Sequence, residues 1–176
     1  MNKNRLKSEI LDSNEKAVIN ALLCDARKRT IEIAKETNLS RQTVSNIIKK
    51  LKDNGQIWGY STVIEPEMTG DHFFLILVKF KEDIDVRDIF KKTVNSDMLN
   101  ELTKHKFRYS AYMFGRFDFL TSIYASDIIE ANKIINKTLK PFRKHLSEVF
   151  IHESIITFRR MGIINPNVME EMESLF

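Results

Sequence analysis

The sequence predicts an α+β protein in two parts, a first part of three helices followed by a short strand or wing, and a second part that alternates strands with helices. Three observations predict it. Apolar residues recur at helical spacing three times before residue 55, and the segment 65–71 is punctuated by Pro and Gly. Beyond it, runs dense in Phe, Ile, Leu and Val alternate with helical patterns. With 176 residues the chain can form one domain or two small ones.

The first helix is predicted to begin after Asp12, because Asp12 and Glu15 have the spacing of a capping box. Its inner face consists of Ala17, Val18, Ala21 and Leu22. The single cysteine, Cys24, falls on the same helix and has no partner for an internal disulfide. We interpret it as a small core residue.

Two further helices follow at close intervals. One carries Ile31, Ile33 and Ala34, begins near Thr30 without a small polar cap (Arg29 stands there), and ends at Asn38, a residue type that tolerates positive φ. The next begins after the N-cap Ser40 and stops at Asn54-Gly55. Its apolar face consists of Val44, Ile47, Ile48 and Leu51. Three helices with a short turn before the third form the helix-turn-helix layout.

The opposite face of this third helix is polar. Gln42, Asn46 and Lys49 point away from the apolar stripe, and Arg41, Thr43, Ser45 and Lys50 flank them. Amide side chains pair with adenine edges and Arg with guanine, while lysines contact phosphates. A solvated amphipathic helix would carry a similar face, so the neighbouring segments decide between the two interpretations. The predicted DNA-binding residues are Ser40, Arg41, Gln42, Thr43, Ser45, Asn46, Lys49 and Lys50.

Residues 57–64 are rich in aromatic and β-branched side chains and predict a strand or a small wing hairpin. The first 64 residues therefore resemble a winged helix-turn-helix domain. Their net charge is +5, whereas the remainder carries −1, so the basic excess lies where phosphate attraction would need it. Lys3, Arg5 and Lys7 could add phosphate contacts, although a solvated terminus explains them as well.

The second part predicts the order β-α-β-β-α-β, the ferredoxin-like pattern. Strands are expected at 72–80, 107–114, 117–125 and 149–158, with a turn at Gly115-Arg116. The first helix is indicated by Val86, Ile89, Phe90 and Val94, with Met98, Leu99 and Leu102 extending it or starting another. The second is indicated by Ile128, Ile129, Asn132, Ile135 and Leu139, and ends before Pro141.

We expect a winged helix-turn-helix domain at 1–64, a linker at 65–71, the βαββαβ dimerisation and effector domain at 72–160 and a tail at 161–176. Several strands are apolar on both faces, and the chain offers no obvious cover for the second face, which predicts a partner subunit. In the tail, Asn165-Pro166 predicts the start of a short helix. Its apolar residues would dock on a neighbouring subunit, or the tail would simply fray.

Across about residues 11–160 the chain resembles the Lrp/AsnC (feast/famine) family of transcriptional regulators. The resemblance rests on Leu11-Asp12, Glu32-Ile33-Ala34, the run Leu39–Val44, the spacing of Ile47, Leu51, Gly55 and Ile57, the run Gly59–Val63 and, more weakly, the run Gly115–Phe119. It implies DNA binding through the third helix, dimerisation through the βαββαβ domain and assembly of dimers into larger particles.

The resemblance also implies a pocket for an amino-acid effector beside Gly115, Arg116 and Asp118. Arg116 stands where this family often has an acidic residue, which argues against an ordinary amino-acid effector. Ordinary turn chemistry accounts for Gly115 and Asp118 at least equally well.

Other classes find little support in the sequence. The longest apolar run, residues 73–78, is too short to cross a bilayer, and no signal segment opens the chain, so we expect a cytoplasmic protein. His72, His105, His145 and His152 are scattered, and we predict neither a cofactor nor a metal site. Two alternatives stay open: a sirohaem-decarboxylase-like enzyme of the same two-domain layout, and an oligomerisation module that does not bind DNA.

Overall fold

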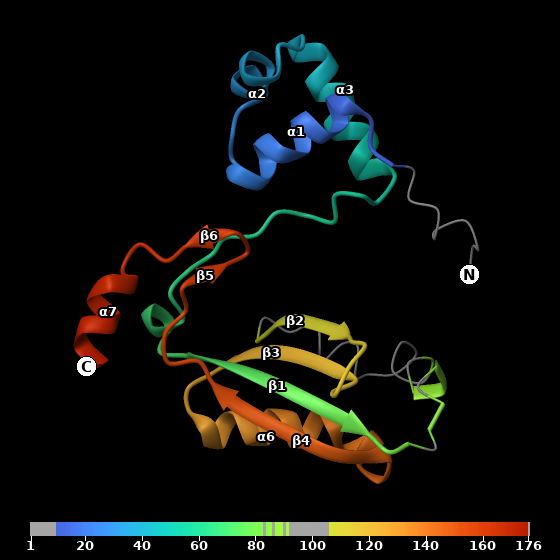
Figure 1. Ribbon diagram of the computed structural model, residues 1–176, viewed down its shortest axis with the longest axis vertical. Coiled ribbons are helices and arrows are strands. Elements are labelled where there is room, and N and C mark those ends of the chain that lie inside the picture. The colour runs from blue at the N-terminus through green and yellow to red at the C-terminus, as the bar shows by residue number, and fades with distance from the viewer. Residues whose placement is uncertain (1–9, 83, 86, 90, 92–105, 176) are drawn as a thin grey trace. The chain divides into compact units, whose positions relative to one another are not determined.

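The computed structural model describes residues 10–82, 84–85, 87–89, 91 and 106–175 (Figure 1). Contacts divide the chain into two compact units. The first contains the residues up to Val63 together with Phe158–Pro166, and the second contains Ile64–Thr157 and Asn167–Phe176. No helix in the described part of the chain is long and apolar enough to cross a membrane.

The first unit contains three helices, α1 (Ser13–Cys24), α2 (Thr30–Thr37) and α3 (Arg41–Asp53), as the sequence predicts (Figure 1). The capping box of α1 is present: Glu15 N donates to Asp12 Oδ1 at 2.8 Å, and Asp12 N donates to Glu15 Oε2 at 3.0 Å. At α2 the side chain of Glu32 accepts from Arg29 N at 2.8 Å and also pairs with the Arg29 guanidinium. Glu32 thus satisfies the backbone N–H of Arg29, although Arg29 forms no side-chain cap hydrogen bond to the first turn.

The core of this unit is small and aliphatic. Val18, Ala21, Ile33, Ala34 and Val44 are buried, and Leu22, Leu39, Ile47 and Ile48 pack against them. The prediction for Cys24 is wrong, because this residue ends α1 and is exposed. It lies three positions beyond the buried Ala21, where the helix is already ending and the core has no further layer.

Residues 57–64 do not form the predicted strand or wing hairpin. The segment is irregular, Trp58 is 97% exposed and Tyr60 is 49% exposed. Side-chain type alone does not make a strand, because the backbone also needs a neighbour with which to form ladder hydrogen bonds. A short hairpin of β5 (Arg159–Arg160) and β6 (Ile163–Ile164) is grouped with the helical unit instead.

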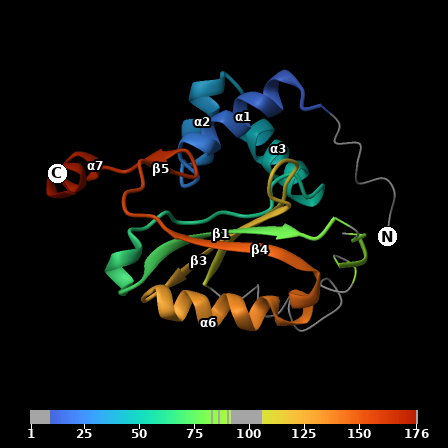
Figure 2. The same cartoon turned by 60° about the horizontal axis from the view of Figure 1, so that its bottom comes forward.

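The second unit is built on a four-stranded antiparallel sheet in the order β2-β3-β1-β4. Its strands are β1 (His72–Phe80), β2 (Phe107–Tyr112), β3 (Phe119–Ala125) and β4 (Leu146–Glu153). Helix α6 (Ile128–Leu139) connects β3 to β4 through the 3-10 turn η3 (Lys140–His145), and a similar turn, η2 (Pro66–Thr69), precedes β1. Figure 2 shows α6 running along one face of this sheet.

Alternation along β1 assigns its side chains to the two faces. Phe74, Ile76 and Val78 are fully buried on the face that α6 covers, together with Ile123 and Ala125 of β3. The other face carries Phe73, Leu75 and Leu77, which are only partly buried. Register places Tyr124, Ser122 and Leu120 of β3 opposite these three residues. This second face, which we call the open face of the sheet because α6 does not cover it, is mostly apolar; Ser122 and Tyr124 on it are buried within the chain.

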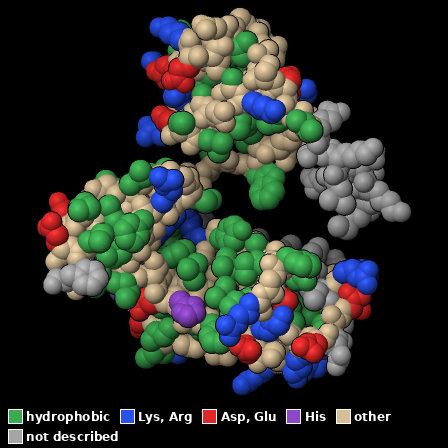
Figure 3. Space-filling model, in the orientation of Figure 1, with side chains coloured by type: hydrophobic (Ala, Val, Ile, Leu, Met, Phe, Trp, Pro, Cys, Tyr) green, Lys and Arg blue, Asp and Glu red, His purple; other side chains and the backbone are tan. Residues whose placement is uncertain are grey.

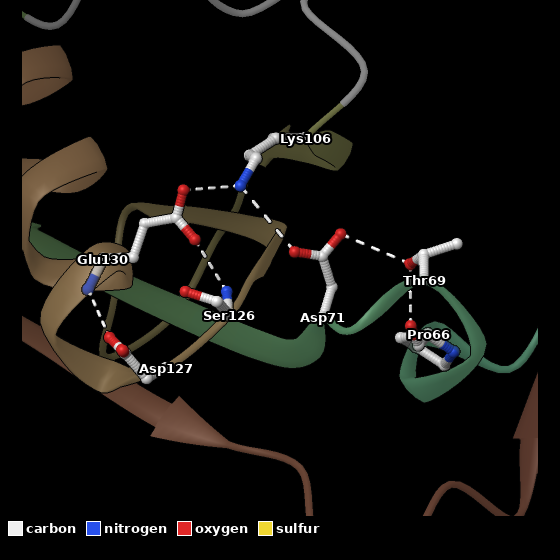
Figure 4. A network of polar contacts seen from close by, with 7 residues as sticks. All are labelled: Pro66, Thr69, Asp71, Lys106, Ser126, Asp127 and Glu130. Atoms are coloured by element: carbon white, nitrogen blue, oxygen red, sulfur yellow. Dashed lines mark hydrogen bonds and ion pairs between the residues drawn. The ribbon is translucent and has the colours of Figure 1, made fainter.

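A polar network ties the start of β1 to the start of α6 (Figure 4). Lys106 Nζ lies 2.6 Å from Glu130 Oε1 and 3.7 Å from Asp71 Oδ1. Glu130 also accepts from Ser126 N at 2.7 Å, while its own N donates to the N-cap Asp127 at 2.7 Å. Hydrogen bonds from Lys106, the largest cause, and from Ser126 lower the pKa of Glu130 to about 2.

Several predicted boundaries are wrong. The strand expected at 107–114 ends at Tyr112, and the strand expected at 117–125 begins at Phe119, because the hairpin connection takes up both ends. The last strand spans Leu146–Glu153 rather than 149–158, and Ile155 and Phe158 are 75% and 58% exposed. Since β4 pairs only with β1, it ends where β1 begins.

The first helix of the βαββαβ pattern falls mostly outside the described residues. Within the part described, 87–89 and 91 are helical and Ile89 is buried in the core, while Val86, Phe90, Val94, Met98, Leu99 and Leu102 lie outside it. The predicted terminal helix exists as α7 (Val168–Leu175). It starts two residues after Pro166 and has no buried residue.

Candidate nucleic-acid interface

The turn between α2 and α3 fixes where α3 begins. Asn38 ends α2 in the left-handed conformation with φ 55°, and Ser40 Oγ accepts from Thr43 N at 3.0 Å as the predicted N-cap of α3. At the other end Asn54 is the C-cap and Gly55 takes φ 67°. The sequence predicted both ends, because each is set by local backbone chemistry.

The buried side of α3 holds the helix against α1 and α2. Val44 and Leu51 are fully buried, and Ile47 and Ile48 pack partly buried against the same core. The aliphatic stripe therefore orients the helix so that its polar residues face outward, as the spacing predicted.

The outward side of α3 presents five exposed polar residues, Arg41, Gln42, Ser45, Asn46 and Lys49. Gln42 Nε2 donates to Asn46 Oδ1 at 3.1 Å, so the two amides lie together one helical turn apart. The Arg41, Ser45 and Lys49 side chains form no hydrogen bond or ion pair with the part of the chain that the structure describes. These groups are available to base edges and phosphates.

Two predicted residues use their hydroxyls within the protein. Ser40 Oγ and Thr43 Oγ1 lie 2.8 Å apart, and the Ser40 oxygen also caps the helix. Both hydroxyls therefore help to form the first turn of α3. Ser40 is exposed and Thr43 is half-buried.

Lys50 connects two helices. Its Nζ lies 2.7 Å from Oε1 of Glu15, whose side chain is only 8% exposed, while the other carboxylate oxygen completes the capping box of α1. The hydrogen bond from Lys50 is the largest of the causes that lower the pKa of Glu15. Lys49, one position earlier, is exposed and has no such partner among the residues described.

Sequence reasoning missed one contact beside this surface. Lys52 Nζ lies 4.8 Å from the centre of the Tyr60 ring, a cation–π contact between the end of α3 and the segment that follows it. Periodicity could not find it, because Tyr60 was assigned to a strand and the chain reverses after Gly55. The contact orders the segment next to α3 and occupies one basic side chain.

The effector residues predicted at the β2–β3 connection are exposed or structurally engaged. Gly115 takes φ 149°, and the Arg116 guanidinium lies 5.5 Å from the Phe117 ring centre. Asp118 Oδ2 accepts from Phe80 N at 2.8 Å, and the Asp118 carboxylate lies 3.3 Å from Lys79 Nζ. The Asp118 side chain thus holds the connection against the end of β1.

The described part of the chain offers little support for a metal site or for a catalytic role of His72 or His152. There, no group of three or more His, Cys, Asp or Glu side chains is arranged to hold a metal ion. His72 Nδ1 lies 2.9 Å from Glu153 Oε1, a contact between the start of β1 and the end of β4. His152 stacks on Phe150 with ring centres 6.2 Å apart.

Comparison with known proteins agrees with this geometry. Residues 11–57 match a family model described as winged helix-turn-helix DNA-binding, and these residues include all of α1, α2 and α3. This match defines the class of the protein: a DNA-binding protein with a winged helix-turn-helix domain.

Relatives extend the match into the second unit. The proline dehydrogenase transcriptional activator of Rhizobium radiobacter is 27% identical over 138 residues, which cover 77% of this chain and 84% of the relative. The leucine-responsive regulatory protein of Haemophilus influenzae is 26% identical, covering 76% and 77%. The structure of E. coli AsnC has the same fold, with a TM-score of 0.58 and 17% identity, covering 84% of this chain and 94% of AsnC.

Over about three quarters of its length this chain is similar to transcriptional regulators of the Lrp/AsnC type, and its residues 11–57 match a winged helix-turn-helix domain that binds DNA. Its homologues are transcriptional regulators, not enzymes. The sirohaem-decarboxylase-like alternative and the module that does not bind DNA are thereby set aside.

Proposed function

We propose that this regulator recognises its operator by placing the outward side of α3 in the major groove. Arg41, Gln42, Ser45 and Asn46 read base edges, and Lys49 contacts a phosphate. The observation that carries the proposal is the exposure of these five side chains on one side of a helix whose other side is fixed in the core. Lys50 is assigned instead to the link with Glu15.

The amide pair makes the recognition specific. The Gln42–Asn46 hydrogen bond restricts both side chains before DNA arrives, which lowers the entropy cost of binding. An amide that keeps one donor and one acceptor free matches the N6 and N7 groups of adenine. We expect the operator half-site to contain adenine at the position that this pair reaches.

The experiment that tests this proposal is a binding assay with Gln42→Ala and Asn46→Ala. Each substitution should cost roughly 1–3 kcal/mol on the preferred sequence and relax discrimination at one base pair. Asn20→Ala serves as the control, because Asn20 is an exposed amide on α1. Equal affinity of all three variants for every sequence would refute base reading by this pair.

We further infer that the protein binds as a homodimer, formed by packing the open face of the sheet against the same face of a second copy. The apolar character of Phe73, Leu75, Leu77 and Leu120 supports this arrangement. Two-fold symmetry would present two copies of α3 to half-sites whose centres are about 10 base pairs, or a multiple of that, apart. Dimers could assemble further into larger particles.

An effector at the β2–β3 connection would meet the exposed Arg116 rather than the Asp118 carboxylate, which is engaged. The positive charge favours a ligand that carries a carboxylate.

A transcriptional regulator acts where the chromosome lies, which in bacteria and archaea is the cytoplasm.

A further inference from the structure

A groove of about 520 Å³ lies between α6, η3 and the edge strand β4. β4 is the last strand of the sheet, and its Val149 and Ile151 are in register with the buried Val78 and Ile76. These two β4 side chains therefore face the same side as α6, but α6 leaves Val149 39% exposed. From the helix a single stripe lines the groove: Ile128, Asn132, Ile135, Asn136 and Leu139.

One end of this groove is cationic. Lys140 and Arg143 line it, and neither side chain forms an ion pair with another residue that the structure describes. Residues 128–145 include five basic residues and one acidic residue, Glu130, which already pairs with Lys106. An apolar floor with a basic end is complementary to an amphipathic segment that carries acidic residues.

The C-terminal helix α7 has that composition. It contains three glutamates and no basic residue, and none of its side chains is buried. Met169 and Leu175 are 65% and 47% exposed. Figure 3 shows hydrophobic and acidic side chains side by side at the surface around α7. No side chain of α7 is buried within its own chain, so its apolar and acidic side chains are accessible to a second copy.

We propose that α7 of one copy docks in the α6–β4 groove of a second copy. The eight residues of α7 span about 12 Å, and the α6 stripe from Ile128 to Leu139 spans about 17 Å, so the helix fits along the groove. Met169 and Met172 would cover the apolar floor, since flexible thioethers fill irregular spaces. Glu170 and Glu173 would face Lys140 and Arg143.

This contact is separate from the open face of the sheet, because the groove lies on the side of the sheet that α6 covers. Because the two contacts use different surfaces, both can form in the same assembly. The proposal therefore stands or falls independently of the sheet-to-sheet dimer and of DNA binding.

The test mixes two full-length chains, each with one cysteine in a Cys24→Ser background. One carries Met172→Cys and a size tag, and the other carries Val149→Cys. A short bismaleimide should join them into a covalent heterodimer, which only contact between chains can produce. Met68→Cys replaces Val149→Cys in the control, since Met68 is 84% exposed and outside the groove.

Heterodimer formation with Val149→Cys, at a yield well above that of the Met68→Cys control, supports docking. Equal yields with the two partners overturn it, and so does the absence of a heterodimer. A chain carrying both Met172→Cys and Val149→Cys that gives only an internally linked monomer overturns the proposal as well. Gel shifts of the same chains show whether DNA binding, a separate claim, is retained.

Charge reversal gives a second test of the same contact. Lys140→Glu with Arg143→Glu in the groove chain should reduce the heterodimer to the control yield. Glu170→Lys with Glu173→Lys in the α7 chain should then restore it. Restoration supports the complementary charges, and failure of both effects contradicts them.

Discussion

Two adjacent lysines on α3 differ in their surroundings. Both lysines are exposed, but Lys50 Nζ lies 2.7 Å from Oε1 of Glu15, whose side chain is 8% exposed, whereas Lys49 has no such partner among the described residues. From the sequence both were assigned to phosphate contacts, because spacing alone gives both an outward direction. They differ because Lys50 reaches Glu15 of α1, which lies 35 residues earlier in the chain. Such a tertiary contact leaves no trace in the local spacing.

This difference predicts opposite phenotypes for Lys49→Met and Lys50→Met. Lys49→Met should leave the melting temperature unchanged and reduce the slope of log affinity against log salt by about 0.9 for each phosphate that Lys49 neutralises. Lys50→Met should lower the melting temperature, because the carboxylate of Glu15 loses its partner. Thermal denaturation and gel shifts at several salt concentrations measure both quantities.

Each lysine variant is the control for the other, since the chemical change is the same. A Lys50→Met protein with the wild-type melting temperature would show that the link to Glu15 contributes nothing. A Lys49→Met protein with the wild-type salt slope would remove Lys49 from the DNA interface.

The helix ends were the most predictable elements. Asp12, Ser40 and Asn38 act through backbone groups within a few residues, so the sequence contains all the information. The ends of β3 and β4 and the missing wing were mispredicted, because a strand extends only as far as its neighbour does. The Lys106–Glu130 and Lys52–Tyr60 contacts could not be predicted from the sequence, because neither pair follows the spacing of a helix or a strand.

The network at the start of α6 predicts a pH dependence of stability. Glu130 has a pKa of about 2 in the folded chain against 4.5 for an ordinary glutamate. Because the folded-state pKa is the lower one, the stabilisation is complete above about pH 4.5 and disappears as the pH falls toward 2. The melting temperature should fall across this window.

Lys106→Met and Glu130→Gln should each flatten that fall, because each removes the paired carboxylate or its partner. Glu67→Gln is the control, because Glu67 is an exposed glutamate that forms no ion pair with another residue that the structure describes. If Glu130→Gln loses melting temperature between pH 4.5 and pH 2 as steeply as the wild type, the network makes no contribution there.

At the scale of the whole molecule, the sequence predicted the order of strands and helices and the open apolar face of the sheet. The terminal helix α7 was predicted from the sequence, but the groove was not, because the groove exists only once α6 and β4 are placed side by side.

The apolar face predicts a test of the proposed dimer. Leu75→Lys places a charge at the centre of that face, opposite Ser122.

Leu75→Lys should convert the dimer to a smaller species in sedimentation velocity and weaken binding to DNA with two half-sites. Binding to a single half-site should change little, since α3 is untouched. Ile129→Lys is the control, because Ile129 is 61% exposed on α6 and lies outside the open face. A Leu75→Lys chain with wild-type mass and circular dichroism would locate the dimer contact elsewhere.

The central claim is that the outward side of α3 reads base sequence. Selection of random DNA by the purified wild-type chain, compared with the Gln42→Ala, Asn46→Ala double variant, tests it most directly. We predict that the wild type enriches a two-fold symmetric motif with half-sites about 10 base pairs, or a multiple of that, apart, and that the double variant loses preference at matching positions in both half-sites. Recovery of the same motif by both proteins would contradict the account.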